Sequence, residues 1–304
     1  MGCQDLQIDS KNLLVMRKLF LSIVSVVALV LSGATAGAKS EDLSLMTFNI
    51  HGQEKDEAGD FSWEARKKGC LKAIKKFDPD VLFLQEAYAY HKADITKEMK
   101  KHMLVDRSAK PGTVDQDIRF NENPIMFRAD KFELLDYGFF WLNENQEADT
   151  PGWDADNVRN ATWVKLRSKK SGLIFFCFNT RFSVKETAGR RSAELMVDKI
   201  KEIAGDDAVV FLGGDFKMSS QDRLLSSLVS YAKDANFSMK KPDTRASYNG
   251  YGKSVDSVRW PDHILFRNAE VEEYEVVDGK FGPKFISDHY PVYAEFEIPI
   301  PKGK

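Results

Sequence analysis

The segment Ser287-Asp288-His289-Tyr290-Pro291 lies near the end of the chain, and an apolar side chain follows at every second position from Val292 to Phe296. This alternation predicts a strand, with the imidazole of His289 placed just before it. The neighbouring carboxylate of Asp288 could orient that imidazole as a general base or as a partner of a transition state. Most histidines near strand ends are surface residues. The segment therefore indicates a functional site only together with other segments of the chain that fit the same chemistry.

Five further predicted strands carry polar residues at one end, where burying an apolar residue would cost less free energy. These are Asn49 after Leu45–Phe48, Gln85-Glu86 after Val81–Leu84, Asn179-Thr180-Arg181 after Ile174–Phe178, Gly213-Gly214-Asp215 after Val209–Leu212, and Asp262 before His263–Phe266. Carboxylates that converge repel each other and therefore imply a metal ion. Oxygen ligands without cysteine fit Mg²⁺ or Mn²⁺ rather than zinc.

Each of these residues also has a structural interpretation. Asp215 could cap a helix that starts near Gln221, or it could lie in a turn. Glu86 could pair with a surface lysine, and Asp262 could belong to the turn after Pro261. The functional interpretation depends on all of these residues occurring together in one chain.

The pattern of hydrophobic residues predicts an α/β fold. Strands are expected at Leu43–Ile50, Val81–Gln85, Pro124–Phe127, Phe132–Trp141, Ala161–Leu166, Leu173–Asn179, Ala208–Leu212, His263–Arg267, Val271–Asp278 and Val292–Ile298. Helices are expected at Trp63–Phe77, Ala188–Ala204 and Gln221–Tyr231. Many strands, few helices and no Gly/Ser-rich linker predict two sheets packed face to face with helices outside.

Residues 1–38 have the features of a secretory signal peptide. The basic start Met16-Arg17-Lys18 precedes the apolar core Leu19–Leu31, which is too short to span a membrane, and small residues follow at Ala34-Thr35-Ala36. An uncleaved anchor is the alternative. We expect cleavage to leave residues 39–304 as a single domain, secreted or periplasmic and without a stable membrane anchor.

Charge and cysteine content narrow the class of partner. The chain has a net charge of −2, and its leader holds three basic and two acidic residues, so the remainder carries −2 − 1 = −3. This balance argues against non-specific binding to nucleic acid, which needs a basic face. Cys70 and Cys177 are expected to be two buried thiols rather than a disulfide framework. The oligomeric state stays open.

Taken in order, the motifs resemble the endonuclease/exonuclease/phosphatase family, which has the DNase-I-like fold. The resemblance covers residues 43–298 and rests on Thr47-Phe48-Asn49-Ile50, Leu84-Gln85-Glu86, Asn179-Thr180-Arg181-Phe182, Gly214-Asp215-Phe216, Asp262-His263-Ile264 and Ser287–Val292. The blocks Asn123-Pro124-Ile125 and Ala161-Thr162-Trp163 are typical of its secreted bacterial members. The resemblance implies a four-layered α/β sandwich and cleavage of phosphoric esters with Mg²⁺ or Mn²⁺ as cofactor.

The family pattern also implies a role for individual residues. Glu86 and Asn49 would hold the metal ion, and Asp288 would help with the metal or with the imidazole. Asp215 would orient or deprotonate the attacking water. His289, oriented by Asp262, would stabilise charge or remove a proton at phosphorus.

Three positions depart from the family pattern. Arg181 stands where the family has His, Lys217 where it has Asn, and Asn121 where it has the Glu that partners the missing His; Glu122 is one position off. The loss of a histidine together with its partner carboxylate indicates correlated change, and activity could be reduced.

The two new basic residues allow several interpretations. Arg181 and Lys217, with Asn179, could bind a phosphate group of the substrate. Lys217 could instead pair with Asp215 or Glu86 and displace the metal. Both basic side chains could also point to solvent.

Two functions of different kind follow. The first is a secreted Mg²⁺-dependent hydrolase that acts on a small phosphorylated substrate. The second is a catalytically impaired relative that binds a phosphorylated or anionic ligand. A nuclease ranks third, because the paired lysines along the chain are typical of solvated helix faces and turns. Aromatic residues could stack on the substrate or simply pack: Trp141, Trp153, Trp163, Tyr248 and Trp260.

Overall fold

Two six-stranded mixed sheets, packed face to face, form the centre of the body Ser40–Ile300. The first sheet has the order β11 (Glu270–Val276), β12 (Val292–Pro299), β1 (Ser40–Asn49), β2 (Val81–Gln85), β4 (Ile125–Arg128) and β3 (His102–Val105). The second has the order β5 (Phe132–Trp141), β6 (Asn160–Ser168), β7 (Ile174–Arg181), β8 (Val209–Asp215), β10 (Asp262–Arg267) and β9 (Lys233–Asp234). The predicted sandwich is therefore confirmed.

The protein is described here by a computed structural model that covers residues 39–52, 59–107, 110–114, 123–253 and 260–300. The predicted signal peptide, residues 1–38, lies outside these ranges, as do Asn121 and Glu122. Within the described residues, none of the helices is long and apolar enough to cross a membrane.

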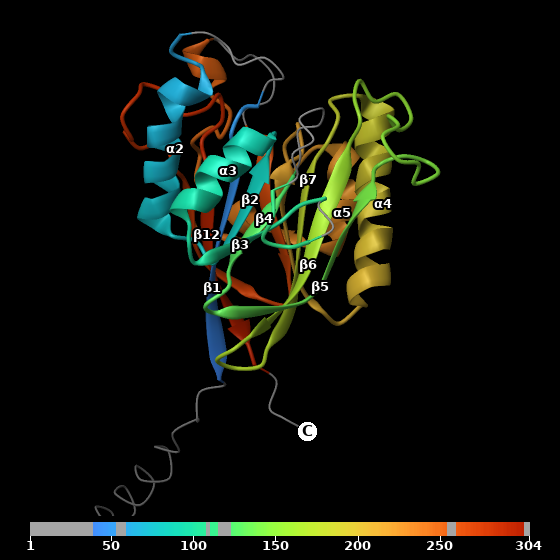
Figure 1. Cartoon of the computed structure of the whole chain (residues 1–304). Helices are drawn as coiled ribbons and strands as arrows, with labels where there is room; N and C mark the ends of the chain where they lie inside the picture. Colours follow the sequence, from blue (N-terminus) through green and yellow to red (C-terminus); the bar gives the residue numbers. More distant parts are fainter. Residues whose placement is uncertain (1–38, 53–58, 108–109, 115–122, 254–259, 301–304) are drawn as a thin grey trace, which may run out of the picture. The chain divides into compact units, whose positions relative to one another are not determined.

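Helices cover the outer face of each sheet (Figure 1). Helices α2 (Trp63–Phe77) and α3 (Ala89–Glu98) lie on the first sheet, and α4 (Glu186–Ala204) and α5 (Ser226–Tyr231) lie on the second. Three apolar clusters result, one between the sheets and one beneath each helical layer. Short elements complete the body: the 3₁₀ turns Arg223–Leu225 and Gly250–Gly252 and helix α6 (Ala235–Ser238).

All ten predicted strands are present, and the polar residues at their ends belong to the strands themselves, except Glu86, which follows β2 directly. Strand β1 includes Asn49, β7 continues to Arg181 and β8 to Asp215. The interpretation of Asp215 as a helix cap is therefore wrong. The predicted helix Gln221–Tyr231 is also wrong in part, because Asp222 accepts a hydrogen bond from the Leu224 N–H (2.9 Å) and caps a 3₁₀ turn before α5 begins.

Helix α3 and strands β3 and β9 were not predicted. Helix α3 buries His91 and Lys92, so its inward face shows no apolar pattern in the sequence. The ammonium group of Lys92 lies 2.7 Å from the carboxylate of Asp106, and both side chains are almost fully buried. A buried charge is tolerated when it is paired in this way, but the pairing cannot be read from helical periodicity.

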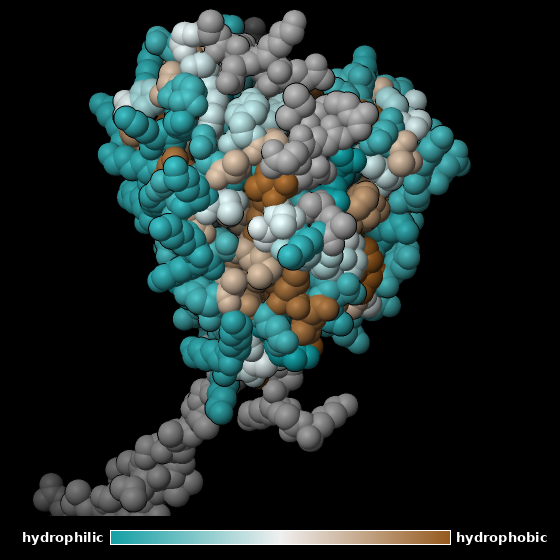
Figure 2. All heavy atoms as spheres, viewed as in Figure 1, coloured by the Kyte–Doolittle hydropathy of each residue, from teal (hydrophilic) through white to brown (hydrophobic). Residues whose placement is uncertain are grey.

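Helix α2 agrees with its predicted bounds. Ser62 accepts a hydrogen bond from the Ala65 N–H at the start, and Asp78 adopts a left-handed conformation (φ 40°) at the end, just before Pro79. The lysines of α2 face outward, and Figure 2 shows a mostly hydrophilic surface over this helix. The two thiols, Cys70 and Cys177, are buried and free, as predicted.

The two sheets approach closely at Gly213 of strand β8. A Cβ atom at this position would lie 2.2 Å from Cδ2 of Phe83, which is fully buried in the opposite sheet. Only a residue without a side chain allows this contact, since real Cβ atoms do not come so near to other heavy atoms.

We expect Gly213→Ala to lower the free energy of unfolding by about 1–3 kcal/mol, because the added methyl group overpacks the core between the sheets. Chemical denaturation would measure the loss. The double variant Gly213→Ala/Phe83→Leu should recover part of it, through coupling between neighbouring residues. Additive losses would contradict this explanation.

Candidate active site

The polar strand ends meet at one edge of the two sheets. Strands β1 and β2 run parallel, as do β7 and β8, so their carboxyl ends lie at the same edge. Strand β10 runs antiparallel to β8 and starts there, with Asp262 opposite Asp215 in register. The topology thus brings together residues that are far apart in the sequence.

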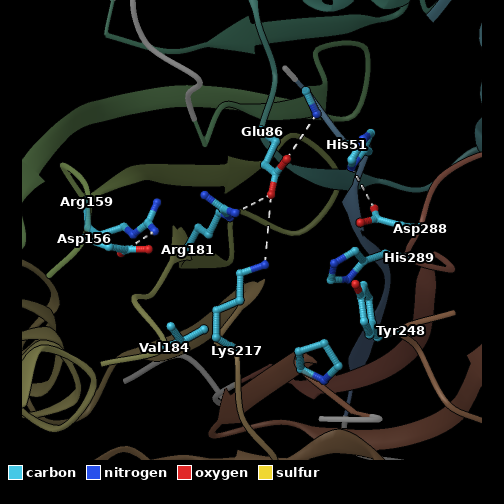
Figure 3. A pocket seen from close by; sticks show the side chains of 12 residues that line it. His51, Glu86, Asp156, Arg159, Arg181, Val184, Lys217, Tyr248, Asp288 and His289 are labelled. Atoms are coloured by element: carbon cyan, nitrogen blue, oxygen red, sulfur yellow. Dashed lines mark hydrogen bonds and ion pairs between the residues drawn. The ribbon is translucent and has the colours of Figure 1, made fainter. Parts of the chain in front are cut away.

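A pocket of about 440 Å³ opens at this edge (Figure 3). This volume suits a small ligand. Its lining residues are His51, Gly52, Glu86, Asp156, Arg159, Arg181, Val184, Lys217, Tyr248, Pro261, Asp288 and His289. Five of them were predicted as site residues, namely Glu86, Arg181, Lys217, Asp288 and His289. The other predicted residues lie buried behind the wall.

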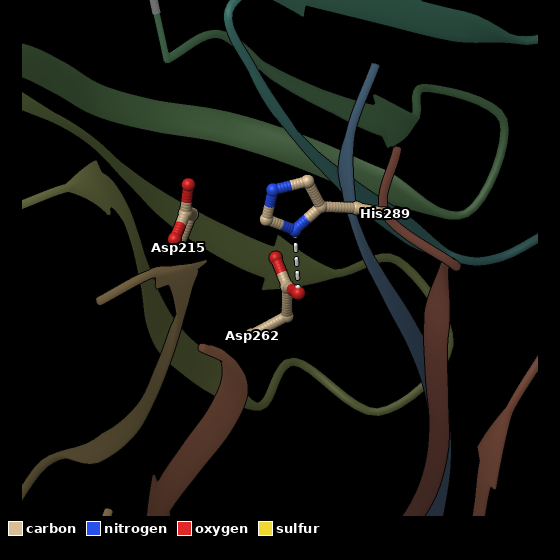
Figure 4. Close-up of side chains that lie close together, drawn as sticks. All are labelled: Asp215, Asp262 and His289. Carbon is tan, nitrogen blue, oxygen red and sulfur yellow. Dashed lines mark hydrogen bonds and ion pairs between the residues drawn. The ribbon is translucent and has the colours of Figure 1, made fainter. Parts of the chain in front are cut away.

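His289 and Asp262 form a buried pair (Figure 4). The Nδ1 atom of His289 lies 2.8 Å from Oδ2 of Asp262, which leaves the other ring nitrogen, Nε2, for the pocket. Burial alone would lower the pKa of His289, but Asp262, followed by Asp215 and Asp288, raises it to about 9. The imidazole is therefore protonated at neutral pH.

The carboxylates of Glu86 and Asp215 are paired with basic side chains. The Nη2 atom of Arg181 lies 2.5 Å from Oε1 of Glu86, and its Nε lies 3.5 Å from Oδ2 of Asp215. The Nζ atom of Lys217 lies 2.6 Å from the same Asp215 oxygen and 4.0 Å from Oε1 of Glu86. The predicted alternative that both basic side chains point to solvent is wrong, because they are only 17% and 18% exposed.

These contacts set the protonation of both carboxylates. Burial would raise the pKa of Glu86, but the neighbouring Arg181 and Lys217 hold it below its ordinary value. Burial opposes ionisation of Asp215 as well, and Lys217, His289 and Arg181 together bring its pKa well below the usual range. Both groups are therefore charged, and Asp215 is a weak base.

Asn49 joins the two carboxylates. Its Nδ2 donates hydrogen bonds to Oε1 of Glu86 (3.0 Å) and Oδ2 of Asp215 (2.8 Å). Its Oδ1 accepts one from the backbone N–H of His51 (3.0 Å). The amide orientation follows from these partners, because a reversed amide would direct an oxygen at two carboxylates.

Three residues at the edge have left-handed backbone conformations that are rare outside glycine. They are His51 (φ 55°), Glu86 (φ 59°) and Lys217 (φ 61°), and each follows the end of a strand by one or two residues. Such conformations cost energy and concentrate at functional sites. Here these conformations direct the three side chains toward one pocket.

The expected metal ligands do not fit a magnesium ion. Glu86 Oε1 already meets Asn49 and Arg181, and its Oε2 accepts a hydrogen bond from the Gly52 N–H (3.2 Å). Asn49 turns its nitrogen, not its oxygen, to the carboxylates. Oδ1 of Asp288 lies 3.2 Å from Nδ1 of His51. Mg²⁺ requires free oxygen ligands in near-octahedral geometry.

A second group of residues could hold a metal by proximity alone. Ligand atoms of Asp215, Asp262 and His289 lie within 4.8 Å of one another (Figure 4). Most of these atoms already have partners: Nδ1 of His289 binds Oδ2 of Asp262, and Oδ2 of Asp215 meets Lys217, whereas Oδ1 of Asp262 has no hydrogen-bond partner.

Asn179, predicted to bind substrate, does not line the pocket. It is fully buried between the sheets, where its Nδ2 donates hydrogen bonds to the carbonyl oxygens of Leu84 (2.7 Å) and Pro124 (2.8 Å). Its Oδ1 accepts one from Gln85 (2.7 Å). Both N–H groups of the amide are therefore used, and Asn179 joins the two sheets beneath the site.

Several pocket residues were not predicted from the sequence, or were given two possible roles. His51 follows Asn49 by two residues, yet nothing in its sequence context predicts its contact with Asp288. Arg159, 7% exposed, lies 3.1 Å from Asp156, and the two line the wall beyond Arg181. Among the five aromatic candidates, only Tyr248 lines the pocket; its ring centroid lies 4.9 Å from that of His289.

Arg66 of helix α2 supports the site from behind. Its guanidinium donates hydrogen bonds to the carbonyl oxygens of Ile50 (2.9 Å) and His51 (2.9 Å) on one side and of Ile286 (2.7 Å) on the other. It therefore ties the segment after β1 to the segment before Ser287, from which His289 projects. The Oγ of Ser287 adds a hydrogen bond to the carbonyl oxygen of Asn49 (2.7 Å).

Comparison with known proteins gives the class of this chain. The sequence profile of the endonuclease/exonuclease/phosphatase family matches residues 46–289, which is most of the chain. The protein belongs to this family. Its membership is consistent with hydrolysis of phosphoric esters. A search of curated proteins found no match.

Solved structures agree with the fold. The chain is similar to an endonuclease/exonuclease/phosphatase from Bacteroides vulgatus, with 28% identity and a TM-score of 0.76 over 85% of this chain and 99% of the other. A mannosyl-6-phosphatase from Bacteroides thetaiotaomicron is 22% identical, with a TM-score of 0.74 over 84% and 99% of the two chains. D. rerio TDP2, complexed with single-strand DNA product, is 16% identical, with a TM-score of 0.67 over 84% and 99%.

We expect Arg66→Met to lower the free energy of unfolding by about 2–4 kcal/mol, because it leaves buried carbonyl oxygens without donors. Arg66→Lys should lose most of the same energy, since an ammonium group cannot reach both segments at once. Chemical denaturation would measure both variants. A neutral Arg66→Lys substitution would show that charge, not the forked geometry, is what matters.

The pair of His289 and Asp262 predicts a pH-dependent contribution to stability. The pKa of His289 in the folded protein, about 9, is above its ordinary value of 6.5. The contribution is therefore complete below pH 6.5 and is lost as the pH rises through about 9. We expect the difference in melting temperature between the unchanged protein and His289→Gln to shrink over this interval. A constant difference would contradict the assignment.

Proposed function

We propose that the protein hydrolyses a small phosphoric ester in the pocket at the sheet edge. Membership of the endonuclease/exonuclease/phosphatase family supports the reaction class. The observation that carries the proposal is the imidazole of His289, held 2.8 Å from Asp262 in a pocket that Arg181 and Lys217 also line. Three cationic groups around one small cavity suit a phosphate group.

The side chains of the pocket supply positive charge to the phosphate group and hold it in position. In the proposed reaction, water attacks phosphorus and the bond from phosphorus to the ester oxygen breaks. One proton of the water passes to the released oxygen, so that the products are the phosphate and an alcohol. The charge on the phosphoryl oxygens is met by Nε2–H of His289 and by the two basic side chains. Phosphoryl transfer passes through a loose transition state, so positioning and electrostatic stabilisation contribute more than a strong base. This fits Asp215, whose low pKa makes it a weak base.

Asp215 therefore has a positioning role in this proposal. It is fully buried beneath Lys217, and its Oδ1 accepts the backbone N–H of that residue (3.1 Å). It fixes the ammonium group at the pocket and adds to the charge that keeps His289 protonated. The role of orienting or deprotonating the attacking water, which the resemblance implies, would require Lys217 to move.

The size and charge of the pocket favour a small phosphorylated substrate over a long nucleic acid. A cavity of about 440 Å³ accommodates a phosphate group with a compact organic part, against which Val184, Tyr248 and Pro261 could pack. The structurally similar mannosyl-6-phosphatase is named for a sugar phosphate. As part of the proposal, we take sugar phosphates as the class of substrate for this chain. We also propose export through residues 1–38.

Mg²⁺ or Mn²⁺ is the cofactor that the resemblance implies, with Glu86, Asn49 and Asp288 as ligands. The oxygens of Glu86 and Asn49 already have protein partners, so no step of the proposed reaction runs through a metal ion.

A second candidate function is binding without turnover. The observation that favours it is the pairing of Asp215 with Lys217 at 2.6 Å, which removes the carboxylate best placed to act on water. In that case the protein would retain a phosphorylated or anionic ligand through the same basic side chains. The two candidates differ only in whether product forms.

Hydrolysis of a chromogenic phosphate monoester and diester would test the proposed function. We expect turnover by the unchanged protein and a loss of about 10²–10³-fold in kcat for His289→Gln, because the variant removes a charged donor from the transition state. His102→Gln is the matched control, because it makes the same substitution at a buried histidine outside the pocket, and its kcat should stay within about threefold. No turnover above the level of His289→Gln would leave binding as the function.

A further inference from the structure

We propose that the guanidinium group of Arg181 and the ammonium group of Lys217 take over the charge role of a divalent metal ion, so that the pocket binds a phosphate group without one. The inference rests on the proposed function in taking a phosphate group as the ligand. It does not depend on turnover.

The first argument is occupancy. Oε1 of Glu86 and Oδ2 of Asp215 face the same space, because both accept hydrogen bonds from one nitrogen of Asn49. Arg181 and Lys217 enter this space from β7 and from the turn after β8, and each approaches both carboxylates. A metal ion at Glu86 would have to displace the guanidinium group at 2.5 Å.

The second argument is charge. The two side chains together carry the charge of one divalent ion, and they lie beside the buried carboxylates that would otherwise need it. A metal ion added to this arrangement would be repelled by both of them. Arg159 and Asp156, 3.1 Å apart on the same wall, form an ion pair that leaves this charge balance unchanged.

The third argument is the backbone at Lys217. This residue has φ 61°, a conformation that asparagine adopts more readily than lysine. The turn directs the Lys217 side chain back onto Asp215, two positions earlier, and the backbone N–H of Lys217 bonds to the same carboxylate. A side chain held in this way is a fixed part of the pocket.

Arg181 is fixed by the sheet. It lies directly beside Asp215 in the parallel pairing of β7 and β8, so its position follows from the register of two central strands. The long side chain reaches past Asp215 to Glu86, which extends from the first sheet. Arg181 therefore joins the two sheets across the pocket, at the place where the family pattern has a histidine.

Calorimetric titration with MgCl₂ and with inorganic phosphate would test the inference. For the unchanged protein we expect no binding of Mg²⁺ at millimolar concentration, and a phosphate affinity that changes by less than about twofold when EDTA is added. The double variant Arg181→His/Lys217→Asn, which restores the family residues, should bind Mg²⁺, and EDTA should weaken its phosphate binding about tenfold or more.

A control variant carries the same two types of substitution, Arg to His and Lys to Asn, at positions outside the pocket. Arg223→His/Lys233→Asn changes two exposed residues outside the pocket, and it should behave as the unchanged protein does in both titrations. Gain of Mg²⁺ binding by this control would overturn the assignment to Arg181 and Lys217.

A single substitution provides an independent test if the double variant does not fold. Glu86→Gln frees Arg181 from its carboxylate, so phosphate should bind several-fold more tightly if basic side chains hold it. If a metal ion held the phosphate, the same substitution would remove a ligand and abolish binding. Loss of phosphate binding in Glu86→Gln would overturn the inference.

The outcomes separate this inference from the proposed function. Phosphate binding without metal, together with no hydrolysis, supports the inference and rejects the proposed function. Phosphate binding by the unchanged protein only when Mg²⁺ is present overturns the inference, whether or not hydrolysis occurs.

Discussion

Two buried carboxylates that face the same small space constrain the rest of the pocket. Oxygens of Glu86 and Asp215 both lie within hydrogen-bond distance of a single nitrogen of Asn49. Two like charges about 4 Å apart repel by about 4 kcal/mol at an effective dielectric constant of about 20, so the arrangement requires positive charge. Arg181 and Lys217 supply it, and the charged His289 adds to it. Lys217 and Glu86 reach their positions through left-handed backbone conformations. The pocket is thus organised around the neutralisation of two acids that the strand register brings together.

The fold could be predicted from sequence where one physical signal dominates. Strand Val81–Gln85 is buried on both faces and begins with the unbroken apolar run Val81–Leu84, and Trp63–Phe77 has both helical periodicity and a clear end at Asp78. Helix α3 could not be found in this way because its buried face contains charge, which is stable only through the distant partner of Lys92. The two residues of β9 are too few to show any period. Such elements depend on contacts that form only in the folded chain.

The candidate site shows the same division. Its polar strand ends were visible in the sequence because each interrupts an apolar run, and the structure brings Asn49, Glu86, Asp215 and Asp262 to one edge. Which atoms face the pocket could not be predicted, since this depends on hydrogen-bond partners. Asn179 shares a strand end with Arg181, yet its amide is used by backbone carbonyls of the other sheet. Arg66 was not selected at all, because an arginine on a helix ordinarily faces solvent, whereas here it is 2% exposed.

The pairing of the first strand with the last has a consequence for the order in which the protein can fold during synthesis. Strand β1 lies between β12 and β2, with Ser40 opposite Pro299 and Thr47 opposite Val292. A growing chain can pair β1 with β2 early, but the other edge of β1 stays open until Val292–Pro299 has been made. The pocket is completed at the same late moment, because His289 lies just before β12. Contacts across so many residues slow folding, so a ribosome-bound chain would expose an unpaired edge and carry no finished site until β12 has been made.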